Sequence, residues 1–198
     1  GWEQQDALLP HMKSMHSFSP DHISEDIELQ AIDFSSYLIE WMATVPKWRD
    51  YYLEHDQSGS YRYLRRTLQA LTWLKGPNRW VLKCPQHMEQ LTILHKTFPD
   101  ATIVITHRDP VASIQSAITM ALYAARVLRR SIEPAKFADY WIDRYTTLLQ
   151  RCVRDRDTLP DSQVIDVYFD QLMRDTDGVL RDIYRKADLP LTDATLTE

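Results

Sequence analysis

The stretch at residues 101–117, ATIVITHRDPVASIQSA, constrains the fold more than any other part of the chain, because an apolar run ends there and a helical pattern begins at once. Residues 102–106 are rich in β-branched side chains, which favour a strand. Asp109 is suited to cap a helix, and Pro110 fits its first position, where no amide donor is needed. The stretch predicts a buried strand that runs directly into a helix.

Strand-like and helix-like segments alternate along the whole second part of the chain. Apolar runs predict strands at 80–83, 102–106 and 163–169. Helical spacing predicts helices at 86–97, 109–130, 134–154 and 177–187, with helical turns at 170–174. This order is typical of an α/β fold, a parallel β-sheet flanked by helices.

The sequence of the first part of the chain predicts helices instead of strands. A cap at Ser19 with Pro20 starts a helical pattern that continues to Pro46, and further helices are predicted at 47–54 and 61–75. We therefore expect a single domain over residues 1–198. Residues 1–78 would form a mostly helical part and residues 79–198 the α/β part.

Composition excludes several classes of protein. A chain of 198 residues with 44% hydrophobic and 26% charged residues is typical of one globular domain, and its net charge of −5 disfavours a general polyanion binder. The two cysteines form neither a disulfide framework nor a zinc pattern, so no metal is expected. No run approaches the ~20 apolar residues of a membrane span, and no signal peptide is recognisable. The prediction is a cytoplasmic protein that binds no nucleic acid and does not insert stably into membranes.

Glycine is scarce, and this bears on nucleotide binding. The chain has four glycines, none clustered, so neither GxxxxGK[ST] nor GxGxxG occurs. Both glycine-rich phosphate loops are therefore absent from these residues.

The junction at residue 108 predicts an anion site. Helix N-termini attract phosphate and sulfate, and the Arg108 guanidinium matches the oxygens of such a group. Ser113 and Ser116 lie three residues apart on one helix face, so Arg108 and Ser116 could hold one phosphate from two sides. The alternative is that Arg108 pairs with a surface acid and the serines are ordinary helix residues.

The stretch WVLKCPQH at residues 80–87 raises a similar hypothesis. Ligands of parallel sheets bind beyond the carboxyl ends of the strands, and Lys83 and Arg108 each end a predicted strand. Lys83 would supply a point charge for a phosphate or sulfate, and His87 could accept a proton near neutral pH. The alternatives are a strand-end lysine that reaches water and a histidine that bonds the backbone.

At these two stretches the chain resembles sulfotransferases that use 3′-phosphoadenosine 5′-phosphosulfate (PAPS), in particular a bacterial-type branch with WVLKSPxH and THRDP motifs. The matching residues here are WVLKCPQH (80–87) and ITHRDPVASIQS (105–116). Residues 14–41, 59–73 and 164–191 also resemble family segments. The resemblance implies a P-loop NTPase-like sulfotransferase fold and transfer of a sulfuryl group from PAPS to a hydroxyl or amine of a small acceptor.

The resemblance also implies roles for individual residues. Arg108 and Ser116 would bind the 3′-phosphate of PAPS, and Lys83 would lie near the sulfuryl group. His87 would be the general base, although it lies four residues after the lysine where well-studied members have two. Tyr168 would contact the adenine.

Other residues compete for two of these roles. Phe169 is the alternative to Tyr168, because neighbouring strand residues point to opposite faces and only one of the pair can face the ligand. His16, Glu25 and His107 are alternatives to His87 as the base.

Two family segments have no counterpart in these residues: the 5′-phosphosulfate loop and the C-terminal loop of the 3′-phosphate site. We therefore expect the 198 residues to be the middle and later part of a longer enzyme. Residues 1–78 would form the acceptor side, and the aromatic residues there suit an apolar acceptor. The rival hypotheses are a kinase-like enzyme and a non-catalytic nucleotide-binding domain.

Overall fold

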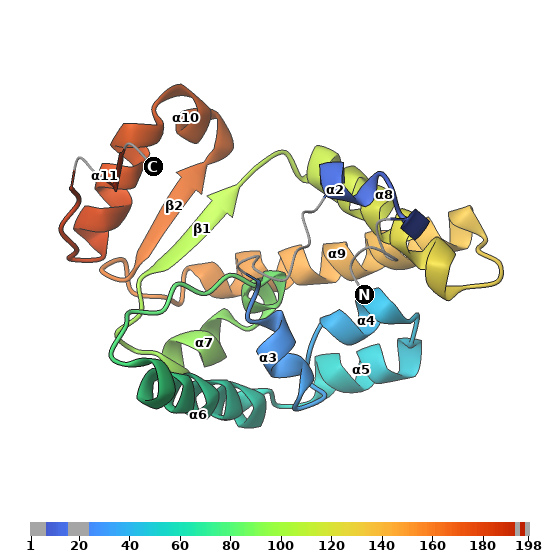
Figure 1. Cartoon of the computed structure of the whole chain (residues 1–198), viewed down its shortest axis with the longest axis horizontal. Coiled ribbons are helices and arrows are strands. Elements are labelled where there is room, and N and C mark those ends of the chain that lie inside the picture. The colour runs from blue at the N-terminus through green and yellow to red at the C-terminus, as the bar shows by residue number, and fades with distance from the viewer. Residues whose placement is uncertain (1–6, 16–23, 193–194, 197–198) are drawn as a thin grey trace.

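A computed structural model describes residues 7–15, 24–192 and 195–196 of the chain. Most of the described residues are helical, with one small sheet (Figure 1). The elements, in chain order, are α2 (Met12–Met15), α3 (Ile27–Ala31), α4 (Leu38–Met42), α5 (Pro46–Glu54), α6 (Ser58–Lys75), the 3₁₀ helix η1 (Pro85–Glu89), α7 (Leu91–Thr97), β1 (Ile103–His107), α8 (Pro110–Leu128), α9 (Pro134–Arg156), β2 (Val164–Tyr168), α10 (Phe169–Arg174) and α11 (Thr176–Lys186).

The sheet consists of β1 and β2, which pair in parallel with Ile103 opposite Val164 and His107 opposite Tyr168. The long helices α8 and α9 form the crossover between the two strands. Helices α10 and α11 contact β2, and in Figure 1 they lie on the opposite side of the strand pair from α7 and α9. The α/β fold with a parallel sheet, expected from the sequence, is confirmed.

The strand predicted at residues 80–83 is wrong. These residues form no ladder, and Val81 is 93% exposed. A strand needs a hydrogen-bonded neighbour, and among the described residues β1 pairs only with β2. The helix predicted at 86–97 begins as the 3₁₀ helix η1 and becomes α-helical only at Leu91.

The burial of β1 also differs from the sequence-based prediction, which was a buried strand. Ile103 and Ile105 are buried, whereas Val104 and Thr106, which alternate with them, are exposed. A parallel strand covered on both faces would bury all four residues. The strand is therefore half-buried, with its inner face toward α7 and the residues before β2.

The helix predicted to run up to Pro46 is interrupted. Its proposed cap at Ser19 lies outside the described residues, and the pattern divides into α3 and α4 around Phe34, whose φ is +56°. Tertiary hydrogen bonds explain the interruption, because the Ser36 hydroxyl donates to the Ile27 carbonyl and Gln86 Oε1 accepts from the Tyr37 amide at 2.7 Å. These bonds replace those a continuous helix would make.

Two hydrophobic clusters hold the elements together. The first joins residues of α3, α8 and α9, including Ile27, Ala121 and Trp141, so the helical first part packs directly on the crossover helices. The second joins α6 and α7 to the inner face of the sheet through residues such as Leu91 and Ile105.

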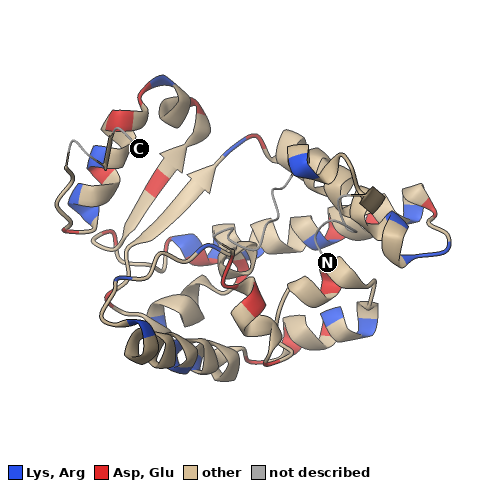
Figure 2. Ribbon diagram, in the orientation of Figure 1, with Lys and Arg blue, Asp and Glu red and all other residues tan. Residues whose placement is uncertain are grey.

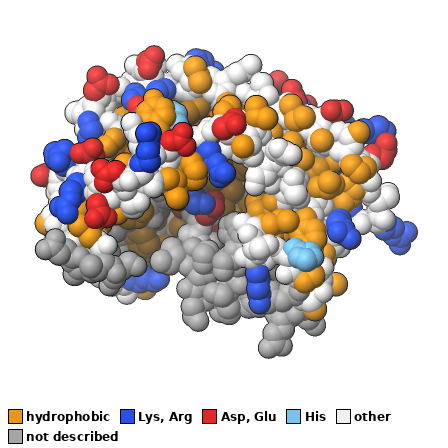
Figure 3. Space-filling view, turned by 90° about the horizontal axis from the view of Figure 1, so that it is seen from above, with side chains coloured by type: hydrophobic (Ala, Val, Ile, Leu, Met, Phe, Trp, Pro, Cys, Tyr) orange, Lys and Arg blue, Asp and Glu red, His pale blue; other side chains and the backbone are white. Residues whose placement is uncertain are grey.

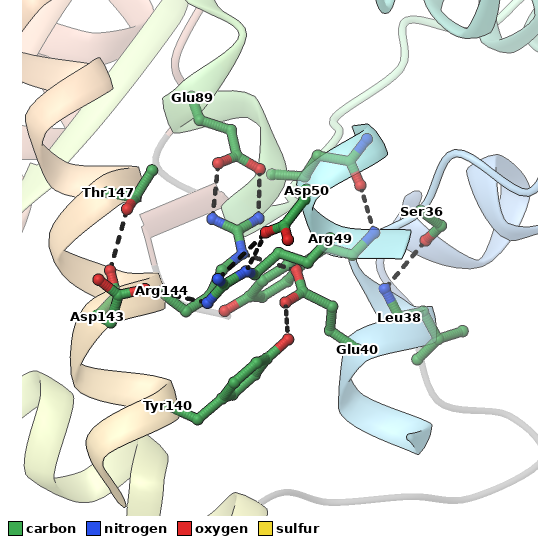
Figure 4. A network of polar contacts seen from close by, with 12 residues as sticks. Ser36, Leu38, Glu40, Arg49, Asp50, Glu89, Tyr140, Asp143, Arg144 and Thr147 are labelled. Carbon is green, nitrogen blue, oxygen red and sulfur yellow. Dashed lines mark hydrogen bonds and ion pairs between the residues drawn. The ribbon is translucent and has the colours of Figure 1, made fainter. Parts of the chain in front are cut away.

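A fully buried charge network crosses the first cluster (Figure 4). Arg144 of α9 donates to Glu40 of α4 through Nε at 2.6 Å and to both carboxylate oxygens of Glu89 in η1 at 2.7 and 2.8 Å. Tyr140 donates its hydroxyl to Glu40 at 2.7 Å, and the Tyr37 ring lies 4.8 Å from the guanidinium carbon. The Arg144 side chain therefore joins α9 to α4 and to η1.

We expect Arg144→Met to lower the free energy of unfolding by about 3–5 kcal/mol, because two carboxylates stay buried without their cation. The matched control is Arg154→Met, on the same helix, whose ion pair with Asp155 has the same 2.6 Å length but a 65% exposed arginine side chain. Arg154→Met should lower the free energy of unfolding by about 0–1 kcal/mol. Urea unfolding measures both, and equal losses would contradict the importance of the buried network.

Candidate active site

The candidate site lies at the carboxyl ends of the two parallel strands. β1 ends at His107 and β2 at Tyr168, which are register partners, so the residues that follow them, Arg108 and Phe169, begin at the same edge. This is the edge at which open parallel sheets bind ligands. Arg108 leads into α8, and Phe169 begins α10 (Figure 1).

Arg108 is exposed, and its guanidinium carbon lies 4.7 Å from the centroid of the Phe169 ring. Among the described residues, no carboxylate lies within ion-pair distance of it. The alternative that Arg108 pairs with a surface acid therefore has no support within this part of the chain. A cation held against an aromatic face, with its donors free, is suited to an anionic ligand.

The start of α8 is built as the sequence predicted. Asp109 caps the helix by accepting from the Val111 amide at 2.9 Å, and Pro110 occupies the first position. Because this carboxylate already uses one free amide, the helix end alone is a weakened anion site, and Arg108 has to supply most of the attraction. Ser116 lies exposed on the second turn of the same helix.

His107 and Tyr168 are brought together on the other side of the strand ends. Their rings stack with centroids 4.9 Å apart, and His107 Nε2 lies 2.7 Å from Asp166 Oδ1. Arg156 also bonds Asp166, and these contacts with Arg156 and then His107 lower the pKa of that carboxyl. His107 is thus occupied by Asp166, and Tyr168 contacts His107 while Phe169 contacts Arg108.

Lys83 forms an ion pair with Glu25, which lies just before α3. The lysine side chain is 72% exposed and the Glu25 side chain 21% exposed. This ion pair joins Lys83, which is predicted to lie near the sulfuryl group, to Glu25, one of the alternatives to His87 as the general base. Sequence reasoning named both residues but not their contact, because 58 positions separate them.

His87 lies in the interior, in η1, between two partners that the sequence did not reveal. Its Nδ1 lies 2.9 Å from the Tyr61 hydroxyl, and its Nε2 is 3.1 Å from Asp26 Oδ2, at an angle outside that of a hydrogen bond. Burial by itself would raise the pKa of Asp26, but the adjacent His87 imidazole and a hydrogen bond from Gln30 lower that pKa overall. Asp26 is therefore ionised at neutral pH beside the imidazole.

The predicted residues fall into two groups in the structure. Lys83 and His87 belong to a group with Glu25, Asp26 and Tyr61, and the other group surrounds the strand ends. Within the described ranges, no hydrogen bond, ion pair or ring contact joins the two groups. The alternative base His16 lies outside the described residues.

The helix α8 that carries Ser116 is unusually apolar and exposed. Over Pro110–Leu128 its mean hydropathy is 1.4, and 11% of the window is buried. Its length and composition match those of a membrane-crossing helix, which corrects the expectation that no run approaches that length; one such helix is weak support for a span. Figure 3 shows hydrophobic side chains gathered on the right, where α8 lies in Figure 1, and charged side chains on the left, over α10 and α11.

Comparisons with known proteins identify the fold and the family. The chain is similar to the solved sulfotransferase STF1 from Mycobacterium tuberculosis H37Rv, at 29% identity and a TM-score of 0.83, over 99% of this chain and 56% of that one. It is also similar to sulfotransferase STF9 from Mycobacterium avium, at 25% identity and a TM-score of 0.80, over 96% of this chain and 52% of that one. No curated protein matches the chain.

The chain thus spans about half the length of these solved relatives. The model of the sulfotransferase family matches residues 1–193, which is almost the whole chain. The resemblance inferred from the WVLKCPQH and THRDP stretches is therefore confirmed at the level of the family. This chain belongs to the sulfotransferase family.

Proposed function

We propose that the chain forms the 3′-phosphate side and part of the reaction centre of an enzyme that transfers a sulfuryl group from PAPS to a hydroxyl or amine of a small molecule. The observation that carries the proposal is the Arg108 guanidinium, which lies on Phe169 at the carboxyl ends of the strands and has no ion-pair partner among the described residues. Arg108 and Ser116 would bind the 3′-phosphate. Family membership favours this function over a kinase-like enzyme, which was the rival interpretation.

The aromatic contact to the nucleotide has two candidates. Tyr168 is the sequence-based choice and is 52% exposed, but it stacks on His107. Phe169 lies against Arg108 and is 39% exposed. When the 3′-phosphate is bound to Arg108, the adenine ring would contact Phe169 more readily than Tyr168. We therefore propose Phe169 for this role and Tyr168 as the alternative.

The reaction needs a cation at the leaving group. A bond forms between the acceptor oxygen or nitrogen and sulfur, and the bond from sulfur to the bridging phosphate oxygen breaks, so negative charge grows on that oxygen. Lys83 is the proposed cation because its side chain is 72% exposed and would reach the bridging oxygen once its ion pair with Glu25 opened. Such a charge stabilises the transition state more than the ground state.

The reaction also needs a group that takes the acceptor proton. His87 was the sequence-based choice, but Nε2 is buried against Asp26 and Nδ1 faces the Tyr61 hydroxyl. An acceptor would reach either nitrogen only after one of these contacts opened. Glu25 lies beside Lys83 and reaches the surface, so we propose Glu25 as the base and His87 as a residue that positions η1 and Lys83.

We expect the chain to bind adenosine 3′,5′-bisphosphate more tightly than 5′-AMP or ATP, by roughly 1.5–3 kcal/mol for the charge-assisted contact to the 3′-phosphate. Arg108→Ala should abolish this preference, while the control Arg174→Ala, an exposed arginine on α10, should keep it. Calorimetric titration measures the three ligands on each variant. Equal binding of all three by the unaltered chain, or a preference for ATP, would contradict the assignment.

We expect Glu25→Gln to lower kcat by about 10²–10⁴, the usual contribution of a general base. His87→Gln should lower kcat far less. The measurement is release of adenosine 3′,5′-bisphosphate from PAPS with 4-nitrophenol as the probe acceptor. A large loss in the His87 variant with little loss in the Glu25 variant would reverse the two roles.

A further inference from the structure

The outer face of α6 carries a stripe of cationic side chains that the proposed reaction does not use. Arg62, Arg66, Gln69 and Trp73 follow one another at spacings of four, three and four residues, so they lie along one line of the helix, and Arg65 lies beside it. The opposite face of the same helix is buried, through residues that include Tyr61, Leu64 and Leu68.

The three arginines are exposed. In the part of the chain that the structure describes, no carboxylate lies within ion-pair distance of any of them. Together with Gln69 they line a shallow cavity of about 340 Å³ on the helix surface. Figure 2 shows these basic positions along α6, which lies at the edge of the molecule. The patch stands out because the chain as a whole carries a net charge of −5.

The stripe ends in large apolar side chains. Trp73 is 83% exposed and Leu74 is 68% exposed, on the last turn of the helix. Isolated exposed apolar residues are ordinary, but a tryptophan in line with two exposed arginines, with a third arginine beside them, is a specific combination. Basic side chains attract anionic headgroups, and tryptophan is enriched at membrane–water interfaces.

We propose that this α6 face docks on an anionic lipid surface. The opposite sign of the patch and of acidic phospholipid headgroups supplies the attraction, and Trp73 with Leu74 supplies apolar insertion. The net negative charge of the rest of the chain would repel such a surface, so only this face would bind. A nucleic acid or an acidic protein would use the arginines but has no need of the aliphatic Leu74. The proposal is independent of the sulfuryl-transfer reaction.

The test is flotation of the chain with phosphatidylcholine vesicles that contain or lack phosphatidylserine. Binding should require phosphatidylserine and weaken at high salt. The triple variant Arg62→Gln, Arg65→Gln, Arg66→Gln should reduce the partition coefficient by on the order of a hundredfold, since each basic residue near an anionic surface contributes about one kcal/mol.

A matched control removes three positive charges from another surface of the protein. The triple variant Arg174→Gln, Arg181→Gln, Arg185→Gln alters exposed arginines of α10 and α11 and should retain most of the binding. Circular dichroism verifies that both triple variants are folded. Equal loss in the two variants would overturn the proposal, because it would indicate a general charge effect.

Trp73 offers a second readout. Its emission should shift to the blue when vesicles are added, and the shift should disappear in Trp73→Phe. Binding of a single-stranded oligonucleotide or of polyglutamate more tightly than vesicles would overturn the proposal in favour of those partners. No binding to phosphatidylserine vesicles at low salt would also overturn it.

Discussion

The buried guanidinium of Arg144 is the constraint on which the arrangement of the helices depends. A charge in the interior is tolerated only when its donors are satisfied, and here Glu40 and Glu89 satisfy them from two different elements. Because Glu89 belongs to η1, the same interaction fixes that five-residue turn against α9. Gln86, in the same turn, bonds Gln30 and the Tyr37 amide, so η1 is anchored on two sides.

The anchoring of η1 connects the core to the proposed chemistry. Lys83 precedes this turn by two residues, and His87 lies within it. Tyr61 and Asp26 hold the His87 ring from α6 and from the residue before α3, and Glu25, next to Asp26, reaches Lys83. The internal contacts thus orient a short segment whose outer side presents one cation and one carboxylate. The second group, around Arg108 and Phe169, depends instead on the register of two parallel strands.

Much of this organisation was predictable from the sequence. The junction at Asp109–Pro110, the two long helices that follow, and the strands that became β1 and β2 all have local signals: β-branched runs, a capping residue and apolar residues at helical spacing. The family was predictable for the same reason, since its motifs, WVLKCPQH and THRDP, are short continuous stretches of sequence. The sequence also indicated a buried arginine, but not its partners. Arg144 lies in line with Phe137, Trp141 and Leu148 on the buried face of α9, where an arginine requires an acidic partner.

The remaining features were decided by the tertiary structure. Residues 80–83 have strand-forming side chains but no strand, because pairing is a property of two segments. The helix before Pro46 breaks because Gln86, far along the chain, takes the Tyr37 amide. The contacts of His87 and of Glu25 join segments tens of residues apart, and no local pattern encodes them. Local side-chain chemistry thus determined which elements form and which family the chain belongs to, whereas the distribution of the reactive groups between surface and interior depended on long-range packing.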